Sequence, residues 1–179
     1  MSKRIAFLTA SEGIEEVELT QPWKAAVDAG HTAELLSLDE GEVQLFNHLD
    51  KSSTQRVDRR VSDVAIGDYD ALVLPGGVAN PDALRADETA VAFVRDFVDS
   101  GKPVAAICHA AWTLVEADRV RGKRLASWPS LQTDIRNAGG DWRDEEVRTC
   151  NMQGYTLVTS RKPDDLDAFN TALIDAFAD

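Results

Sequence analysis

The chain contains little cysteine, little histidine and no residue cluster with metal-ligand spacing. Of its 179 residues, two are cysteine, Cys108 and Cys150, and three are histidine. Two isolated cysteines provide neither a disulfide framework nor a CxxC redox motif, and the pattern matches no zinc site. A dinucleotide fingerprint is also missing from the sequence. The sequence therefore predicts no metal and no cofactor.

Positive charge and long apolar runs are also scarce. The chain has 19 Lys and Arg against 31 Asp and Glu, which gives a formal net charge of −12 at pH 7. Such an acidic chain is poorly suited to bind nucleic-acid phosphates. No apolar run approaches the roughly 20 residues of a membrane-spanning helix, and acidic residues interrupt the N-terminal segment before a signal-peptide core develops. We therefore expect a cytoplasmic protein without a membrane or a stable nucleic-acid partner.

Short apolar runs alternate with helical patterns over a length that suits one domain. Strands buried on both faces are predicted at residues 4–9, 32–38, 69–74 and 104–107. Helices are predicted at residues 15–29, 87–98, 108–117 and 163–177. This alternation predicts one domain across residues 1–179, a doubly wound α/β sandwich with a mostly parallel central sheet and helices on both faces.

The remaining segments are less regular. Residues 40–67 predict an excursion of small strands or turns, and residues 122–129 a strand that ends at a proline. A short helix is expected at residues 130–138, and a hairpin around residues 152–154. These segments add no linker or repeat.

In a doubly wound fold, ligands bind beyond the carboxyl ends of the strands. One of the three loops predicted there contains Cys108, between Ala106 and Ala110. Small residues at this spacing are typical of a nucleophile elbow, where a strand turns sharply into a helix. The helix N-terminus would then lower the thiol pKa. The alternative is that Cys108 is simply a small, buried hydrophobic residue. This stretch alone does not decide between the two interpretations.

The other two loops, residues 10–18 and 75–82, carry acids and glycines. Glu15 or Glu18 could hydrogen-bond the thiol and move a proton as a general acid or base. Alternatively, these glutamates only favour the N-terminus of a helix. The backbone N–H groups of Gly76 and Gly77 could hold an oxyanion together with that of His109, or the two glycines could form only a tight turn.

His109 directly follows Cys108, so its ring is not expected to fold back onto the sulfur. It could assist substrate protonation, pair with a carboxylate, or only pack. Asp82 is a possible partner for it, or an ordinary exposed acid. Structural or surface roles are expected for three further residues: His31, His48 and Cys150.

Six segments in order along the chain resemble the successive motifs of the PfpI family of the ThiJ/PfpI superfamily. Members of this family are described as intracellular protease-like or general stress proteins. The resemblance covers essentially the whole chain. The segments are Phe7–Ala10, Glu15–Glu18, Leu72–Gly77, Gly101–His109, Ser127–Ser130 and Ser160–Pro163.

The resemblance implies a flavodoxin-like fold with Cys108 as the elbow nucleophile and His109 as the second member of a Cys-His pair. It favours Glu18 as the carboxyl that hydrogen-bonds Cys108, with Glu15 as the close second. Asp82 stands where relatives carry a glutamate that reaches the histidine of a neighbouring subunit. A homodimer or hexamer with Asp82 acting across the interface is therefore expected.

By the same resemblance, the chain is expected to be a cysteine-dependent, stress-protective hydrolase. Its substrate would be a reactive carbonyl or an early glycation adduct, as for a deglycase or a glyoxalase. One alternative is a PfpI-type intracellular cysteine peptidase. Another is a redox sensor or chaperone with an oxidisable Cys108. No histidine follows His109 in the sequence, which excludes a class I glutamine amidotransferase.

Overall fold

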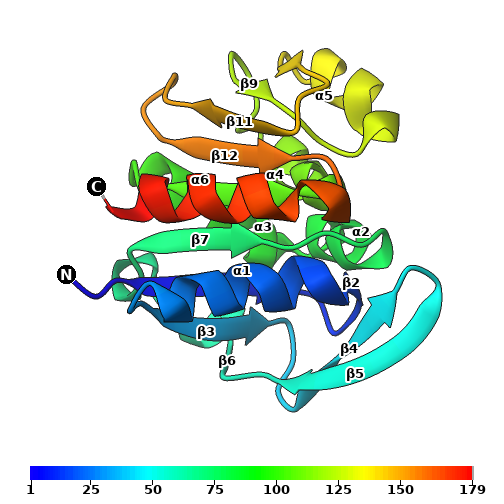
Figure 1. Cartoon of the computed structure of the whole chain (residues 1–179), viewed down its shortest axis with the longest axis vertical. Helices are drawn as coiled ribbons and strands as arrows, with labels where there is room; N and C mark the ends of the chain where they lie inside the picture. Colours follow the sequence, from blue (N-terminus) through cyan, green and yellow to red (C-terminus); the bar gives the residue numbers. More distant parts are fainter. Residues whose placement is uncertain (179) are drawn as a thin grey trace.

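The fold is built on a central sheet, which the computed structural model describes within residues 1–178 (Figure 1). Its strands are β1 (Arg4–Thr9), β3 (Thr32–Ser37), β6 (Arg59–Arg60), β7 (Ala71–Leu74), β8 (Val104–Ile107), β11 (Val147–Cys150) and β12 (Leu157–Ser160). They hydrogen-bond in the order β11-β12-β8-β7-β1-β3-β6. Every neighbouring pair is parallel except β11 and β12, which form the predicted hairpin.

Helices cover both faces of this sheet. They are α1 (Glu16–Asp28), α2 (Ala79–Ala86), α3 (Glu88–Asp99), α4 (Ala111–Glu116), α5 (Gln132–Asn137) and α6 (Leu166–Ala178). In Figure 1, α1 and α6 lie in front of the sheet, whereas α3 and α4 lie behind it. The predicted doubly wound α/β architecture is confirmed.

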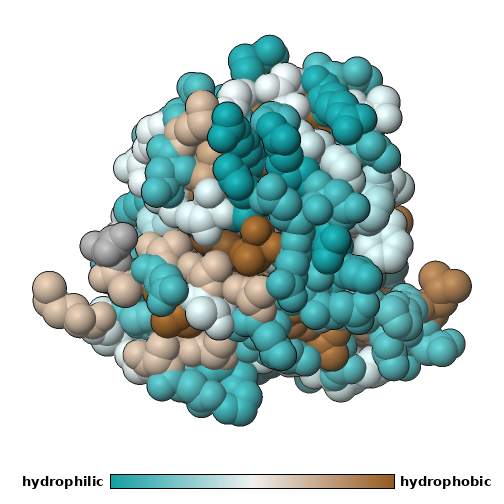
Figure 2. Space-filling model, turned by 45° about the horizontal axis from the view of Figure 1, so that its top comes forward, coloured by the Kyte–Doolittle hydropathy of each residue, from teal (hydrophilic) through white to brown (hydrophobic). Residues whose placement is uncertain are grey.

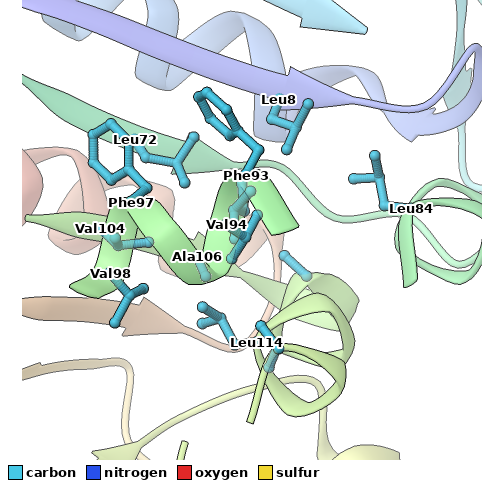
Figure 3. Close-up of a cluster of buried hydrophobic side chains, with 14 of the residues drawn as sticks. Leu8, Leu72, Leu84, Phe93, Val94, Phe97, Val98, Val104, Ala106 and Leu114 are labelled. Atoms are coloured by element: carbon cyan, nitrogen blue, oxygen red, sulfur yellow. The ribbon is translucent and has the colours of Figure 1, made fainter. Parts of the chain in front are cut away.

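Two hydrophobic cores form because successive side chains of a strand point to opposite faces. In β1, Ile5 and Phe7 join the core beneath α1 and α6. Ala6 and Leu8 join the core beneath α3 and α4, where Phe97 packs as well (Figure 3). All five side chains are fully buried. Burial of each large one stabilises the fold by about 1.5–3 kcal/mol.

A second, smaller sheet lies near the carboxyl ends of the parallel strands. It consists of β2 (Glu12–Glu15), β4 (Glu42–Asn47) and β5 (Asp50–Arg56), in the order β2-β4-β5. In Figure 1 the β4–β5 hairpin extends on the side toward which the arrows of β3, β7 and β12 point, and α2 lies on that side too. The irregular excursion predicted for residues 40–67 is therefore this hairpin together with β6.

Local structure differs from the prediction in three places. Residues 12–15 form β2, where a loop and, at residue 15, the start of a helix were predicted. They form a strand because they pair with β4, a partner that local sequence does not reveal. The 75–82 loop contains the start of α2, whose Pro81 stands in the first turn, where a proline disrupts no helical hydrogen bond. The strand expected at 122–129 reduces to β9 (Arg124–Leu125), because its partner β10 (Asp141–Trp142) has only two residues.

The face of the molecule that Figure 2 shows is mainly hydrophilic. Hydrophobic residues gather there in small, separate areas. Within residues 1–178, no helix has the length and apolarity that a membrane crossing requires.

Candidate active site

Cys108 lies at the sharp turn that follows β8. Ile107 is still extended, Cys108 has a φ of 62°, and a short 3₁₀ turn then leads into α4. A positive φ is unusual for a residue with a side chain and costs about 1–3 kcal/mol. The neighbouring Ala106 and Ala110 are buried, so the turn packs tightly. The structure thus places Cys108 in the elbow geometry that the small-residue spacing predicts.

The surroundings of the sulfur differ from the expectation in two respects. The Sγ atom of Cys108 lies 3.1 Å from Nδ1 of His109, although the ring was not expected to reach it. The left-handed backbone at Cys108 brings the two side chains to the same side of the turn. Burial raises the thiol pKa, and ionisation of Glu18 at higher pH adds to this effect, so the predicted lowering by a helix N-terminus is wrong. The amides of His109 and Gly77 oppose this effect without cancelling it.

Glu18 is the carboxyl beside the thiol. It comes from α1 and is fully buried, and neither of its carboxyl oxygens forms a well-aligned hydrogen bond with another described residue. Burial and the charge of Glu15 raise the Glu18 pKa to about 8, although the Cys108 thiol and the amides of Gly76 and Gly77 act in the opposite direction. Glu18 therefore retains its proton at neutral pH, and it can exchange that proton with the thiol.

Glu15 has a different position, at the end of β2. Its Oε2 accepts a hydrogen bond of 3.0 Å from the backbone N–H of His48, at the tip of the β4–β5 hairpin. The His48 ring lies 3.9 Å from the same oxygen, and its backbone has a φ of 58°. Of the two carboxylates that the sequence left open, Glu18 is thus next to Cys108, whereas Glu15 anchors the hairpin.

Gly76 and Gly77 pass too close to other atoms for a side chain to fit. A Cβ on Gly76 would lie 2.3 Å from Oε2 of Glu18 and 2.7 Å from Cβ of Cys108. Gly77 has a φ of +86°, and a Cβ there would lie 2.0 Å from a backbone oxygen of Gly13. This absence of side chains lets the amide of Gly77 approach the sulfur, as the amide of His109 does.

His109 packs against two tryptophans. Its ring stacks on Trp128 at 5.5 Å with an angle of 21°, and Trp112 lies 5.2 Å away. Burial lowers the His109 pKa to about 4, so the imidazole is neutral at physiological pH. Asp82 is an exposed residue of α2.

A single pocket brings these groups together. Its volume is about 610 Å³, within the usual range for small-molecule sites. Its walls contain Glu15, Glu18, Gly77, Asp82, Cys108 and His109. The sequence-predicted residues of all three loops therefore meet at one edge of the sheet.

The chain is similar to known proteins over nearly its whole length. The DJ-1/PfpI family profile matches residues 3–176. The chain belongs to the DJ-1/PfpI family. Protein/nucleic acid deglycase 2 of Escherichia coli (strain K12) is 41% identical over 170 residues, which cover 95% of each chain. "Putative cysteine protease YraA" of Bacillus subtilis (strain 168) is 40% identical over 170 residues, again 95% of each chain.

Solved structures of the DJ-1/PfpI family share this fold. The crystal structure of Drosophila melanogaster DJ-1beta superposes with a TM-score of 0.87 at 26% identity, covering 99% of this chain and 91% of that one. The flavodoxin-like fold implied by the resemblance is therefore confirmed, and so is the family.

Sequence reasoning missed part of this DJ-1/PfpI site. Phe46 and His48 reach the pocket from the β4–β5 hairpin, and Trp112 and Trp128 form the wall beside His109. No motif identifies them, because they depend on how the hairpin and the segment after α4 fold over the sheet edge. The one available signal was Trp128, which lies in a family-like segment. His31 and Cys150 lie elsewhere: the His31 ring accepts the N–H of Lys3 at 3.2 Å, and Cys150 is buried.

Proposed function

We propose that this protein is a cysteine-dependent deglycase, which converts early adducts of reactive dicarbonyls such as methylglyoxal into a hydroxy acid and the free amine. The observation that carries the proposal is the buried Glu18 with a pKa of about 8 beside the Cys108 thiol. A carboxyl with a pKa near the operating pH is suited to give and take protons in turn. Relatives named as deglycases, including Deglycase PH1704 of Pyrococcus horikoshii, support it.

The first step is displacement at the adduct carbon. The sulfur of Cys108 forms a bond to that carbon, the carbon–nitrogen bond breaks, and the thiol proton passes through Nδ1 of His109 to the leaving nitrogen. The 3.1 Å separation of Sγ and Nδ1 permits this transfer. Because the His109 pKa is about 4, the ring holds the proton only transiently. With free methylglyoxal the sulfur adds to the aldehyde, and the thiol proton goes to its oxygen.

Glu18 then moves protons between the two carbons. One carboxyl oxygen removes the proton from the carbon bonded to sulfur, while the other delivers its own proton to the neighbouring carbonyl oxygen. A second exchange places a proton on the neighbouring carbon and removes one from the hydroxyl, which leaves a thioester. Developing negative charge on oxygen is stabilised by the amides of Gly77 and His109. Water hydrolyses the thioester, releases the hydroxy acid and restores the thiol.

The test is lactate formation from methylglyoxal and from its adduct with N-acetylarginine, followed by NMR in amine-free buffer. Wild type and the Cys150→Ala control should produce lactate, whereas Cys108→Ala should lose it by at least about a thousandfold. Equal lactate formation by wild type and Cys108→Ala would refute the proposal.

A cysteine peptidase is the second candidate, and the contact between Cys108 and His109 favours it. A thiol and an imidazole at 3.1 Å can perform acyl transfer, given an acid that orients the ring. A relative carries a cysteine-protease name. Cleavage of an unfolded, unglycated casein by wild type and not by Cys108→Ala would establish this activity. The redox-sensor alternative has less support, because burial raises the thiol pKa rather than lowering it.

We also propose that the protein works in the cytoplasm as a homodimer or hexamer, in which Asp82 reaches His109 of a neighbouring subunit. The position of Asp82 at the pocket edge supports this arrangement, because an exposed acid there is available to a second chain. Mixing the inactive variants Cys108→Ala and Asp82→Ala tests it. If Asp82 acts across an interface, mixed oligomers should recover up to about a quarter of wild-type activity. No recovery in mixed oligomers confirmed by native mass spectrometry would contradict it.

A further inference from the structure

Asn80 carries a polar side chain that holds the turn after β7. It is the second residue of α2 and is fully buried. Its Oδ1 accepts the N–H of Ala10 at 2.7 Å, while its Nδ2 donates to the carbonyls of Pro75 and Gly76, each at 2.9 Å. These partners fix which side-chain atom is which, since a backbone N–H only donates and a carbonyl only accepts. The Asn80 amide therefore joins the residue after β1 to the turn after β7.

The two carbonyls that Asn80 holds determine the direction of two backbone amides. Both peptide bonds are trans, as are all others in the described part of the chain, so each C=O points opposite to the N–H of the next residue. The N–H groups of Gly76 and Gly77 therefore point away from Asn80. Both amides act on Glu18, and that of Gly77 also acts on the Cys108 thiol. One buried side chain thus sets the direction of the donors at the reactive centre.

The glycines themselves give this turn little resistance to rotation. Because glycine adopts φ values of either sign, the peptide unit between Gly76 and Gly77 can flip at low steric cost. A flipped unit would place the Gly76 carbonyl oxygen where the Gly77 N–H now lies. An oxygen in that place would repel a thiolate or an oxyanion, whereas the N–H attracts it. The hydrogen bond from Asn80 to the Gly76 carbonyl opposes the flip.

We propose that Asn80 is a positioning residue, whose side-chain amide holds the Gly76 carbonyl so that the Gly77 N–H stays directed at the sulfur and at the oxyanion that forms beside it. Asn80 does not belong to the described residues that line the pocket, so it acts through the turn and not on the substrate. Its effect on turnover rests on the proposed deglycase function. Its effect on the thiolate of Cys108 does not depend on that function.

Alkylation of Cys108 by iodoacetamide tests the position of the Gly77 amide without any turnover. At pH 7 Glu18 keeps its proton, so the rate depends on how far the amides stabilise the thiolate that reacts. Asn80→Ala should react about tenfold more slowly than wild type, which corresponds to about one unit in the thiol pKa. Asn80→Ser, whose hydroxyl can donate to one carbonyl, should react about threefold more slowly, and it keeps the test open if Asn80→Ala does not fold. Peptide mass spectrometry measures Cys108 separately from Cys150.

Leu84→Ala is the matched control, because it removes a buried apolar side chain from the same helix and leaves Asn80 in place. Leu84 packs in the core beneath α3 and α4 (Figure 3). A protein that is only loosened opens more often and exposes its buried thiol, so Cys108 in this control should react at the wild-type rate or faster. An unchanged or faster reaction in both Asn80 variants would therefore overturn the inference.

Turnover of methylglyoxal then tests the role in the reaction. In Asn80→Ala, kcat should fall by about 10–100-fold with KM within about threefold, because the amide acts on charge that develops in the transition state, whereas kcat in Leu84→Ala should stay within about twofold. An unchanged kcat in Asn80→Ala would overturn the role of Asn80 and leave the deglycase proposal standing. Slow alkylation in Asn80→Ala without lactate from wild type would refute the deglycase and support the positioning of the Gly77 amide.

Discussion

Replacement of Glu18 by glutamine should change how stability depends on pH. Glu18 is fully buried, and its pKa rises from 4.5 to about 8 on folding. Between these two values the folded state keeps a proton that the unfolded state releases. The unfolding free energy of wild type therefore falls as pH rises through this window. Glutamine has a similar shape and does not titrate, so the variant lacks this contribution.

The magnitude follows from the size of the shift. Each pH unit inside the window lowers the unfolding free energy of wild type by about 1.4 kcal/mol, and the whole window lowers it by about 5 kcal/mol. From pH 5 to pH 8, the Glu18→Gln variant should therefore gain about 4 kcal/mol of stability relative to wild type. Its activity should fall by about 10²–10⁴, because glutamine cannot move protons between the two substrate carbons as the carboxyl does.

Urea unfolding at pH 5, 6, 7 and 8, followed by far-UV circular dichroism, measures the difference. Asp175→Asn is the control, since it removes an exposed carboxylate on α6 and should follow the wild-type profile. Parallel profiles for Glu18→Gln and wild type, within about 1 kcal/mol over this range, would show that Glu18 is ionised in the folded protein. That result would refute the reasoning and the role of Glu18 as a protonated shuttle.

Three further outcomes test the site and its support. Cys108→Gly should raise the unfolding free energy of the protein by up to about 1–3 kcal/mol after the lost side-chain contacts are subtracted, because glycine adopts the φ of 62° at this elbow without strain. Thermal unfolding measures this gain, and the control variant Cys150→Gly should only destabilise the protein. Gly77→Ala should destabilise by more than about 3 kcal/mol, since its Cβ would clash with a backbone oxygen, whereas Gly30→Ala, at φ +83° in open space, should lose about 1 kcal/mol. Lys123→Met should lose about 3 kcal/mol in urea unfolding, because the buried ammonium donates to three backbone carbonyls; a neutral effect would contradict this assignment.

Local sequence was sufficient to predict those elements whose characteristic residue pattern lies within the element itself. Apolar runs without alternation marked the parallel strands, because such strands are buried on both faces. The spacing Ala106-Ile-Cys108-His-Ala110 marked the elbow, because only small residues allow a strand and a helix to approach so closely. Both patterns can be recognised without knowing where the segment lies in the fold.

Signals that depend on distant partners were missed or misinterpreted. The strand β2 exists because it pairs with β4, so neither segment alone indicates it. The pKa of Cys108 was expected to fall with the helix N-terminus, yet burial and Glu18 raise it. Desolvation depends on everything packed around a group, and a local motif contains no information about that.

The sequence by itself determined the family, the doubly wound order of strands and helices, and the three loops that meet at the strand ends. The order of strands and helices follows from periodicity, whereas the family follows from the resemblance of short motifs in which neighbouring residues act together. Only the tertiary structure decided that Glu18 rather than Glu15 lies beside Cys108, that His109 reaches the sulfur, and that a hairpin completes an acidic, aromatic pocket. Those outcomes depend on the backbone angle at one strained residue and on contacts between segments far apart in the chain.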